Sequence, residues 1–332
     1  MQPLRIGILG AARIAELALI EPAAATGNAV VAVAARDDQR AKDYARRHGI
    51  DKAHSSYQDL IDDPDVEVVY NPLVNSLHAE WNIAALRAGK QVLSEKPFAS
   101  NAVEAVAVQA VAAESAGTIV EGFHYLHHPV ARRIREIVES GVLGELRSVD
   151  IDMQMAAPPD DDPRWSFELA GGALMDLGCY ALHAQRQFGR WTSGEPTIVS
   201  AAGGERAGRP GVDEWMRVEL VFPGGLPGTV TVNIAAAGER SMPWTITGDR
   251  GSVTAPSWPV PHLDDRVILT TAAGTVVESL GTRTSYTYQL EAFASSLRGG
   301  GPFPLGAADA VANMRLVDSA YLAAGFPVRG TP

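Results

Sequence analysis

The sequence of 332 residues contains a single cysteine, Cys179. One cysteine cannot form an intrachain disulfide or supply a cysteine-based metal cluster. No uninterrupted apolar run reaches the roughly 18 residues that a membrane-spanning helix needs. The first residues lead into an expected strand without a signal peptide, so we expect a cytoplasmic protein with no membrane partner.

The sequence is also poor in positive charge. It has 28 lysines and arginines against 39 acidic residues, which gives a formal net charge of −11. Such a chain has no basic stripe to neutralise phosphates, so we do not expect a nucleic-acid partner. Hydrophobic residues make up 46% of the sequence, which is enough for sizeable cores. A chain of this length is expected to form two domains.

Short apolar runs alternate with helical stretches in the first third of the chain. Each run is followed by a polar or small-residue tip and then by a helix, which is the pattern that builds a right-handed parallel sheet. We therefore predict an α/β fold whose N-terminal domain, residues 1–122, is a doubly wound Rossmann sheet. The expected strands are residues 4–9, 30–34, 66–70, 91–94 and 118–121.

A turn of small residues follows the first strand and begins a helix. Free backbone N–H groups and the helix dipole make such a turn a site for an anion such as a pyrophosphate. The three glycine positions of the dinucleotide fingerprint are Gly10, Ala12 and Ala15, so this motif alone is weak. The residues expected to bind a cofactor here are Gly7, Gly10, Ala11, Ala12, Arg13 and Ile14.

The end of the second strand bears on the choice of cofactor. An acidic residue at this place pairs with the ribose of NAD, whereas an arginine accommodates the extra phosphate of NADP. The strand is followed by Arg36 and Asp37, with Arg40 close behind. Arg36 and Arg40 favour NADP(H), and Asp37 keeps NAD(H) possible.

The stretch from Val92 to Phe98 ends a buried strand in Glu95, Lys96 and Pro97. Open parallel sheets bind ligands at the carboxyl ends of their strands. Pro97 cannot continue the ladder and holds Lys96 in an extended conformation. We predict that Lys96 meets both cofactor and substrate. Further cofactor contacts are expected from Pro72, Leu73, Asn75, His78 and Glu95.

The second half of the chain has a different periodicity. Apolar and polar residues alternate from Leu146 to Met155, which is typical of a half-buried antiparallel strand. Similar strands are expected around residues 197–201, 215–222, 229–236, 244–247 and 267–271. Residues 123–332 are therefore predicted to form an α+β domain with an open, mostly antiparallel sheet.

Two groups of polar residues in this half invite a functional interpretation. If the chain is helical from Leu174, then Asp176, Tyr180 and His183 lie on one face at i, i+4 and i+7. The histidines at 124, 127 and 128 suggest a metal, but Pro129 follows them and no cysteine or carboxylate stands at ligand spacing. We therefore expect no metal site.

Several stretches together resemble the glucose-fructose oxidoreductase, inositol dehydrogenase and MocA family. No single motif carries the resemblance, which runs nearly end to end. The stretches are Leu4–Gly10, Tyr57–Val66, Asn75–His78, Ala88–Pro97 and Gly171–Gly178, followed by Tyr288–Phe293 and Ala308–Ala310.

The resemblance implies an NAD(P)-dependent oxidoreductase with Lys96, Asp176 and Tyr180 as catalytic residues. Tyr180 is similar to the acid/base tyrosine of one branch of the family, where other members have histidine. The resemblance also implies substrate contacts by Lys96, His124, Asp176, Tyr180 and His183, and cofactor contacts by Arg164 and Trp165. Leu126 stands where relatives frequently have arginine, so any substrate contact of that arginine is in doubt for this chain.

The expected substrate is a sugar, a cyclic polyol or a trans-dihydrodiol. An NADPH-dependent reductase of a keto-sugar, which could be nucleotide-linked, is the alternative. A non-catalytic cofactor-binding sensor is a third interpretation, which retention of Lys96, Asp176 and Tyr180 opposes. The resemblance further implies a homodimer or homotetramer.

Overall fold

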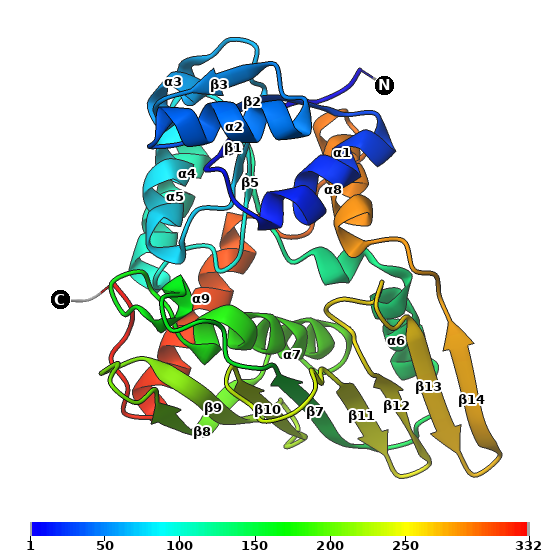
Figure 1. The fold of residues 1–332 in the computed structure, drawn as a ribbon. Helices are drawn as coiled ribbons and strands as arrows, with labels where there is room; N and C mark the ends of the chain where they lie inside the picture. Colours follow the sequence, from blue (N-terminus) through cyan, green and yellow to red (C-terminus); the bar gives the residue numbers. More distant parts are fainter. Residues whose placement is uncertain (1, 331–332) are drawn as a thin grey trace. The chain divides into compact units, whose positions relative to one another are not determined.

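The computed structural model describes residues 2–330, which divide into two compact units (Figure 1). Unit 1 runs to His124 and also contains Tyr286–Ala312, whereas unit 2 contains Tyr125–Ser285 and the chain from Asn313 onward. This division differs from the predicted domains 1–122 and 123–332, because a late segment of the chain returns to the first unit.

Unit 1 contains a six-stranded sheet in which every neighbouring pair is parallel. The order β3-β2-β1-β4-β5-β6 reverses between β1 and β4, so the predicted doubly wound Rossmann sheet is confirmed. The sequence did not predict β3, which is short and half-buried throughout. The strands are β1 (Arg5–Leu9), β2 (Ala29–Ala34), β3 (Lys52–His54), β4 (Val68–Asn71), β5 (Gln91–Ser94) and β6 (Ile119–Glu121).

Helices cover this sheet, and α2, α3 and α5 begin at polar caps. The Asp37 side chain accepts a hydrogen bond from Arg40 N at the start of α2, and that of Asn101 accepts one from Glu104 N at the start of α5. A π-helical turn, Glu16–Ile20, precedes α1. The helices are α1 (Glu21–Thr26), α2 (Asp38–His48), α3 (Tyr57–Asp62), α4 (His78–Arg87), α5 (Ala102–Glu114) and α8 (Ser285–Leu297).

Helix α8 belongs to unit 1 because its apolar face completes that core. Tyr286, Leu290 and Phe293 are buried in the same cluster as Ala15 and Leu19 of the first helical segment. Figure 1 shows α8 beside α1, although nearly the whole chain separates them in sequence. Burial of these side chains is the driving force that holds the late segment here.

Unit 2 contains an eight-stranded sheet in the order β14-β13-β12-β11-β7-β10-β9-β8. Strands β7 and β10 are parallel, and the other neighbouring pairs within residues 2–330 are antiparallel, so the predicted open, mostly antiparallel sheet is confirmed. The strands are β7 (Leu146–Gln154), β8 (Thr197–Glu205), β9 (Asp213–Val221), β10 (Pro227–Asn233), β11 (Trp244–Gly248), β12 (Gly251–Ala255), β13 (Arg266–Thr271) and β14 (Gly274–Ser279).

The alternation predicted for β7 is confirmed, since Val149, Ile151 and Met153 are buried. Helix α7 (Cys179–Trp191) lies against β7 and β10, and α6 (Pro129–Glu139) lies against β12 and β13 (Figure 1). The last helix, α9, spans Ala307–Ala323. The sequence did not predict β12 or β14, and β14 is almost entirely exposed, so it carries no alternating pattern. No helix within residues 2–330 combines the length and apolar character needed to cross a membrane.

Gly7 lies inside β1, and packing alone requires a glycine there. An added Cβ atom would lie 2.8 Å from Leu60 Cδ2 and 3.0 Å from Val66 Cγ1. The structure therefore accounts for Gly7 by the close approach of α3 to β1, and its predicted cofactor contact stays a prediction.

Replacing Gly7 with alanine should lower the free energy of unfolding by about 1–3 kcal/mol, because the added methyl overpacks the contact with Leu60 and Val66. Urea unfolding of Gly7→Ala against the parent protein measures this. Gly306→Ala is the control, since no atom lies within 4 Å of its added Cβ. Equal stability of Gly7→Ala and the parent would contradict the packing argument.

Candidate active site

The turn after β1 has the geometry of a tight strand-to-helix connection. Gly10 adopts a left-handed conformation with φ of 87°, and its N–H donates to Ala34 O at 2.7 Å. A Cβ atom at this position would lie 2.9 Å from Leu73 Cδ2, so both backbone angle and space favour glycine. Ala12 N donates to Gly10 O at 2.9 Å and closes the turn.

Two side chains of α2 hold this turn from one side. Arg40 Nη2 donates to Ala11 O at 3.0 Å, and Tyr44 Oη donates to Ala12 O at 3.0 Å. Burial, aided by the carboxylate of Glu16, raises the pKa of Tyr44 to about 12, so its hydroxyl remains protonated and able to donate. The turn therefore has a fixed shape even though it lacks two of the three glycines of the fingerprint.

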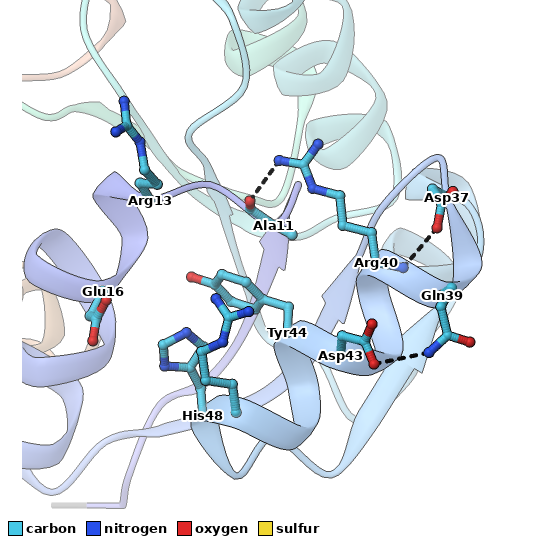
Figure 2. Close-up of a pocket in the computed structure, with 10 residues that line it drawn as sticks. Ala11, Arg13, Glu16, Asp37, Gln39, Arg40, Asp43, Tyr44 and His48 are labelled. Atoms are coloured by element: carbon cyan, nitrogen blue, oxygen red, sulfur yellow. Dashed lines mark hydrogen bonds between the residues drawn. The ribbon is translucent and has the colours of Figure 1, made fainter.

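A cavity of about 690 Å³ opens beside the turn, between α2 and the π-helical turn (Figure 2). Within residues 2–330, Arg13, Arg40 and Arg47 line it without forming an ion pair with any carboxylate. Guanidinium groups without an ion-pair partner can bind an anionic ligand such as a phosphate. The carboxylates of Glu16, Asp37 and Asp43 line the same cavity. The lining residues are Ala11, Arg13, Glu16, Asp37, Gln39, Arg40, Asp43, Tyr44, Arg47 and His48.

The residues predicted to determine the preference for NADP(H) or NAD(H) differ in their position relative to the cavity. Arg40 lines the cavity, whereas Arg36 is exposed and is not among the lining residues. Asp37 also lines the cavity, and its carboxylate is engaged by Arg40 N at 2.7 Å as the cap of α2. Ile14 is 39% exposed beside the turn.

The loop that carries Lys96 is fixed by hydrogen bonds on both sides of the lysine. Tyr70 Oη donates to Glu95 Oε1 at 2.8 Å, and Phe98 N donates to Glu121 Oε1 at 2.9 Å. Lys96 itself is half-buried, and the peptide bond between Lys96 and Pro97 is cis. Burial raises the pKa of Glu95, which the Lys96 charge and the Tyr70 hydroxyl oppose.

His78 ties the ends of β4 and β5 together. It is 1% exposed, and its ring nitrogens lie 2.6 Å from Pro97 O and 2.8 Å from Leu73 O. Burial lowers the pKa of His78. The structure thus gives His78 a part in holding the Lys96 loop, and its predicted cofactor contact stays a prediction. Of its predicted neighbours in the site, Pro72 is buried and Asn75 is half-buried.

In unit 2, the segment with Asp176 and Tyr180 is not the uninterrupted α-helix that the sequence analysis assumed. Leu174–Gly178 forms a π-helical turn, and α7 begins after it. The spacing of i, i+4 and i+7 on one α-helical face therefore does not apply to Asp176. π-Helical turns within helices are frequent at functional sites.

Asp176 forms an ion pair that the sequence did not predict. Arg164 Nε donates to Asp176 Oδ2 at 2.7 Å, and Arg164 also pairs with Asp162 at 3.1 Å. The Asp176 carboxylate raises the pKa of Arg164, so the guanidinium remains charged beside it. Trp165, predicted as a cofactor contact, is 1% exposed and donates its indole N–H to Pro158 O at 3.3 Å.

Tyr180 is 6% exposed and lies in an aromatic group with Tyr125 and Trp258. His183 is fully buried behind it, with Nδ1 at 2.7 Å from Tyr125 Oη and Nε2 at 3.1 Å from Gln187 Nε2. The structure thus gives His183 a partner on each ring nitrogen, and its substrate contact stays a prediction.

Of the other histidines of the sequence analysis, His124 and His128 are buried and His127 is half-buried. In unit 1, the ring of His124 packs against that of Tyr286, with centroids 3.8 Å apart. His128 caps α6 by accepting from Val130 N at 3.2 Å. In residues 2–330, no three His, Cys, Asp or Glu side chains gather in a metal-binding arrangement.

The sequence analysis missed residues that act through hydroxyl groups over long sequence separations. Tyr44 reaches Ala12, Tyr70 reaches Glu95, and Tyr125 reaches His183. Only Tyr70 had a signal in the sequence, because it stands at the end of an apolar strand, where a buried hydroxyl needs a partner. Tyr44 stands in a polar helix and Tyr125 among histidines, so neither had such a signal.

The sheet order and the turn beside this cavity define a dinucleotide-binding Rossmann domain, and a second α+β unit follows it. Residues 4–123 match the oxidoreductase family with an NAD-binding Rossmann fold, and residues 131–254 match the GFO/IDH/MocA C-terminal domain. The chain therefore belongs to the GFO/IDH/MocA oxidoreductase family. It is an NAD(P)-dependent oxidoreductase, as predicted.

Similar proteins include sugar and diol dehydrogenases. A D-xylose 1-dehydrogenase (NADP(+)) of Haloferax volcanii is 33% identical over 318 residues, 95% of each chain. A trans-1,2-dihydrobenzene-1,2-diol dehydrogenase of Bos taurus is 36% identical over 234 residues, 69% of this chain and 67% of that protein.

Among solved structures, a 3-ketoreductase from Actinomadura kijaniata in complex with NADP and TDP-benzene has a TM-score of 0.89 at 28% identity. The match covers 97% of this chain and 98% of that one. Variants of that ketoreductase in which a lysine is replaced by alanine or a tyrosine by phenylalanine have also been solved.

Replacing Arg40 with methionine should weaken NADPH binding by about tenfold or more, because a charge-assisted contact to phosphate is lost. NADH has no phosphate on the adenosine ribose, so its affinity should fall by less than that of NADPH, because it loses only the effect of the Arg40 hydrogen bond on the turn. Fluorescence titration with both nucleotides measures this. Lys42→Met, on the same helix but outside the cavity, is the control. Unchanged NADPH affinity in Arg40→Met would contradict the assignment.

Tyr44→Phe should weaken NADPH and NADH binding by the same factor, about two- to tenfold, because the lost bond to Ala12 holds the turn that both cofactors share. The same titration checks this. A loss confined to one nucleotide would place Tyr44 in cofactor selection instead.

Proposed function

We propose that the protein transfers a hydride between NADP(H) and the carbon of a secondary alcohol, ketone or hemiacetal in a sugar-like substrate. The observation that supports the choice of NADP(H) is the set of guanidinium groups of Arg13, Arg40 and Arg47, which line the cavity beside the Gly10 turn without an ion pair to a carboxylate. Arg36 is exposed at the end of β2 and adds positive charge at that edge of the sheet. NAD(H) remains the second cofactor to test.

The turn and cavity of unit 1 fit the nucleotide. Gly10–Ala12 would hold the pyrophosphate, and Arg40 with Arg13 would hold the ribose phosphate. The nicotinamide supplies or accepts the hydride when it is bound. Every other step is assigned to side chains of this chain.

The proton of the reacting hydroxyl needs an acceptor, and in reduction the carbonyl oxygen needs a donor. We assign this role to Tyr180. A phenol has an ordinary pKa near 10, so Tyr180 would act as a donor directly and as a base when a cation favours the phenolate. The ammonium group of Lys96 would provide that cation and hydrogen-bond the substrate oxygen.

Asp176 would orient the amine of Lys96 and balance its charge. The ion pair with Arg164 adds a second task, because it fixes the carboxylate in one rotamer. Arg164 thus acts through Asp176 in this scheme and is a positioning residue. His124 and His183 would shape the substrate pocket from their buried positions.

The substrate is proposed as a sugar, a cyclic polyol or a trans-dihydrodiol, which D-xylose and dihydrodiol dehydrogenases among the relatives support. Reduction of a nucleotide-linked keto-sugar is the second candidate. The structural match to a 3-ketoreductase, which covers 97% of this chain, supports it. A non-catalytic sensor is the third, and the fixed positions of Lys96, Asp176 and Tyr180 oppose it.

We further propose a cytoplasmic homodimer or homotetramer. One face of the unit 2 sheet carries Trp215, 38% exposed, on β9 beside half-buried threonines of β10. Such a face is suited to contact a second copy. Light scattering coupled to gel filtration determines the number of chains.

Lys96→Met and Tyr180→Phe should each lower turnover by about a hundredfold or more, the usual scale of acid/base catalysis, while NADPH affinity stays within about threefold. The assay follows reduced-nicotinamide absorbance with D-xylose, myo-inositol, a trans-dihydrodiol and a dTDP-linked 3-keto-sugar.

The same panel, used with the parent protein, separates the substrate classes. Oxidation of a free sugar or diol supports the first substrate class, and reduction of the keto-sugar alone supports the second.

The pair is tested in the double variant, with Lys42→Met again as the control. If Lys96 acts by favouring the phenolate of Tyr180, the losses are not additive, so the double variant is about as slow as either single variant. Near-normal turnover in Tyr180→Phe would remove it from the mechanism.

A further inference from the structure

The π-helical turn Leu174–Gly178 begins without a side-chain cap from its own N-terminal residue, Ala173. Its first amide is satisfied from a distant part of the chain, because Leu174 N donates to Asp213 Oδ2 at 2.6 Å. Asp213 is the first residue of β9. A buried carboxylate therefore takes the place of an N-cap at the segment that carries Asp176 and Tyr180.

The same carboxylate is bound by two residues from the end of the chain. Tyr321 Oη donates to Asp213 Oδ1 at 2.9 Å, and Arg329 Nη2 donates to the same oxygen. Arg329 Nε also donates to Gly171 O at 2.7 Å, directly before the π-helical turn. Asp213, Tyr321 and Arg329, which we call the C-terminal clamp, thus hold the backbone at residues 171 and 174.

The clamp is packed so tightly that it leaves little freedom. Asp213 and Arg329 are both fully buried, and the Arg329 guanidinium lies 4.2 Å from the ring centroid of Tyr321. An added Cβ at Gly172 would lie 2.0 Å from Asp213 Oδ1. The backbone at Gly172, just before the π-helical turn, therefore lies directly against the Asp213 carboxylate. A shift of the carboxylate would displace this backbone.

A second attachment lies one residue before Tyr180. Asn313 Nδ2 donates to Cys179 O at 3.1 Å, and Asn313 is fully buried in α9. The segment from Gly171 to Cys179 is thus bound at both ends by residues of the last part of the chain, and Asp176 lies between the two attachments.

A fully buried ion pair seldom adds more to the free energy of unfolding than apolar residues of similar volume would. An ion pair differs from apolar packing in that it fixes orientation. The Asp213 carboxylate accepts from three donors, which together allow it one orientation. Catalysis is sensitive to misplacement of about 1 Å, which can lower turnover a hundredfold. The location of this pair at the Asp176 and Tyr180 segment points to positioning.

We propose that Asp213, Tyr321 and Arg329 are positioning residues, which hold the π-helical turn so that Asp176 and Tyr180 present their side chains to the substrate. The inference rests on the catalytic roles proposed for those two residues. It adds a requirement that the last residues of the chain contribute to turnover without touching the substrate.

Tyr321→Phe is the primary test, because it removes one donor from Asp213 and keeps the ring. Turnover on the best substrate of the panel above should fall about tenfold, with NADPH affinity within about twofold. Hydrogen exchange should accelerate at residues 174–180 and stay unchanged in the unit 1 sheet. Arg329→Lys should have the same effects, because lysine keeps the charge but cannot bond Gly171 O and Asp213 Oδ1 at the same time as the guanidinium does.

The same changes are then made in the Tyr180→Phe background. Positioning predicts less than about twofold further loss there, because Tyr180 is already disabled and Asp176 acts through Lys96 on that same residue. A merely structural clamp would lower turnover equally in both backgrounds and would overturn the proposal, as would full turnover in Tyr321→Phe. Arg133→Gln, which breaks the ion pair with Glu278 elsewhere in unit 2, is the control and should leave turnover unchanged.

Different results would contradict the role of Tyr180 and the role of the C-terminal clamp. Full turnover in Tyr180→Phe alone contradicts the proposed mechanism, whatever the clamp variants do. A disabled Tyr180→Phe together with a fully active Tyr321→Phe leaves the mechanism intact and overturns the clamp.

Discussion

The parallel direction of all strands in the unit 1 sheet is the constraint on which the cofactor side of the site depends. Because the strands run the same way, the loops that leave their carboxyl ends share one edge. The Gly10 turn and the Lys96 loop both leave that edge, and His78 joins the ends of β4 and β5 through two backbone carbonyls. Side chains of α2 then fix the turn, and Tyr70 fixes Glu95 beside the lysine.

In unit 2, hydrogen bonds also restrict the positions of the residues with proposed roles, but on a helix instead of at strand ends. The residues proposed for its chemistry lie on a helical segment rather than on strand ends, and the start of that segment is held by the buried carboxylate of Asp213. Arg164 fixes Asp176 through a second, half-exposed ion pair. In both units a residue with an assigned chemical role is surrounded by groups whose hydrogen bonds restrict its position, as precise catalysis requires.

The sequence predicted the features that depend on local patterns. Alternation predicted β7, the apolar runs predicted the parallel strands except β3, and the order of short motifs indicated the family. The roles of Lys96 and Tyr180 stay predictions. It did not predict that α8 returns to unit 1, because Tyr286, Leu290 and Phe293 form an apolar face that could cover any core. The pair of Asp213 and Arg329 is separated by more than a hundred residues, and no local pattern marks such a partnership. The π-helical turn was missed because helical periodicity does not distinguish it from an α-helix.

Deuterium transfer tests the central claim, direct hydride exchange on a sugar-like carbon, most directly. NADPH that carries two deuterium atoms at C4 of the nicotinamide is incubated with the protein and the keto-sugar, and the alcohols of the panel, deuterated at the reacting carbon, are incubated with the protein and NADP+. Mass spectrometry and NMR then follow the label. The account predicts transfer of one deuterium between C4 of the nicotinamide and the reacting carbon in at least one of these reactions, and no label on that carbon from heavy water. Deuterium that reaches the reacting carbon only from the solvent, or a protein that binds NADP(H) and turns over no member of the panel in either direction, would contradict it.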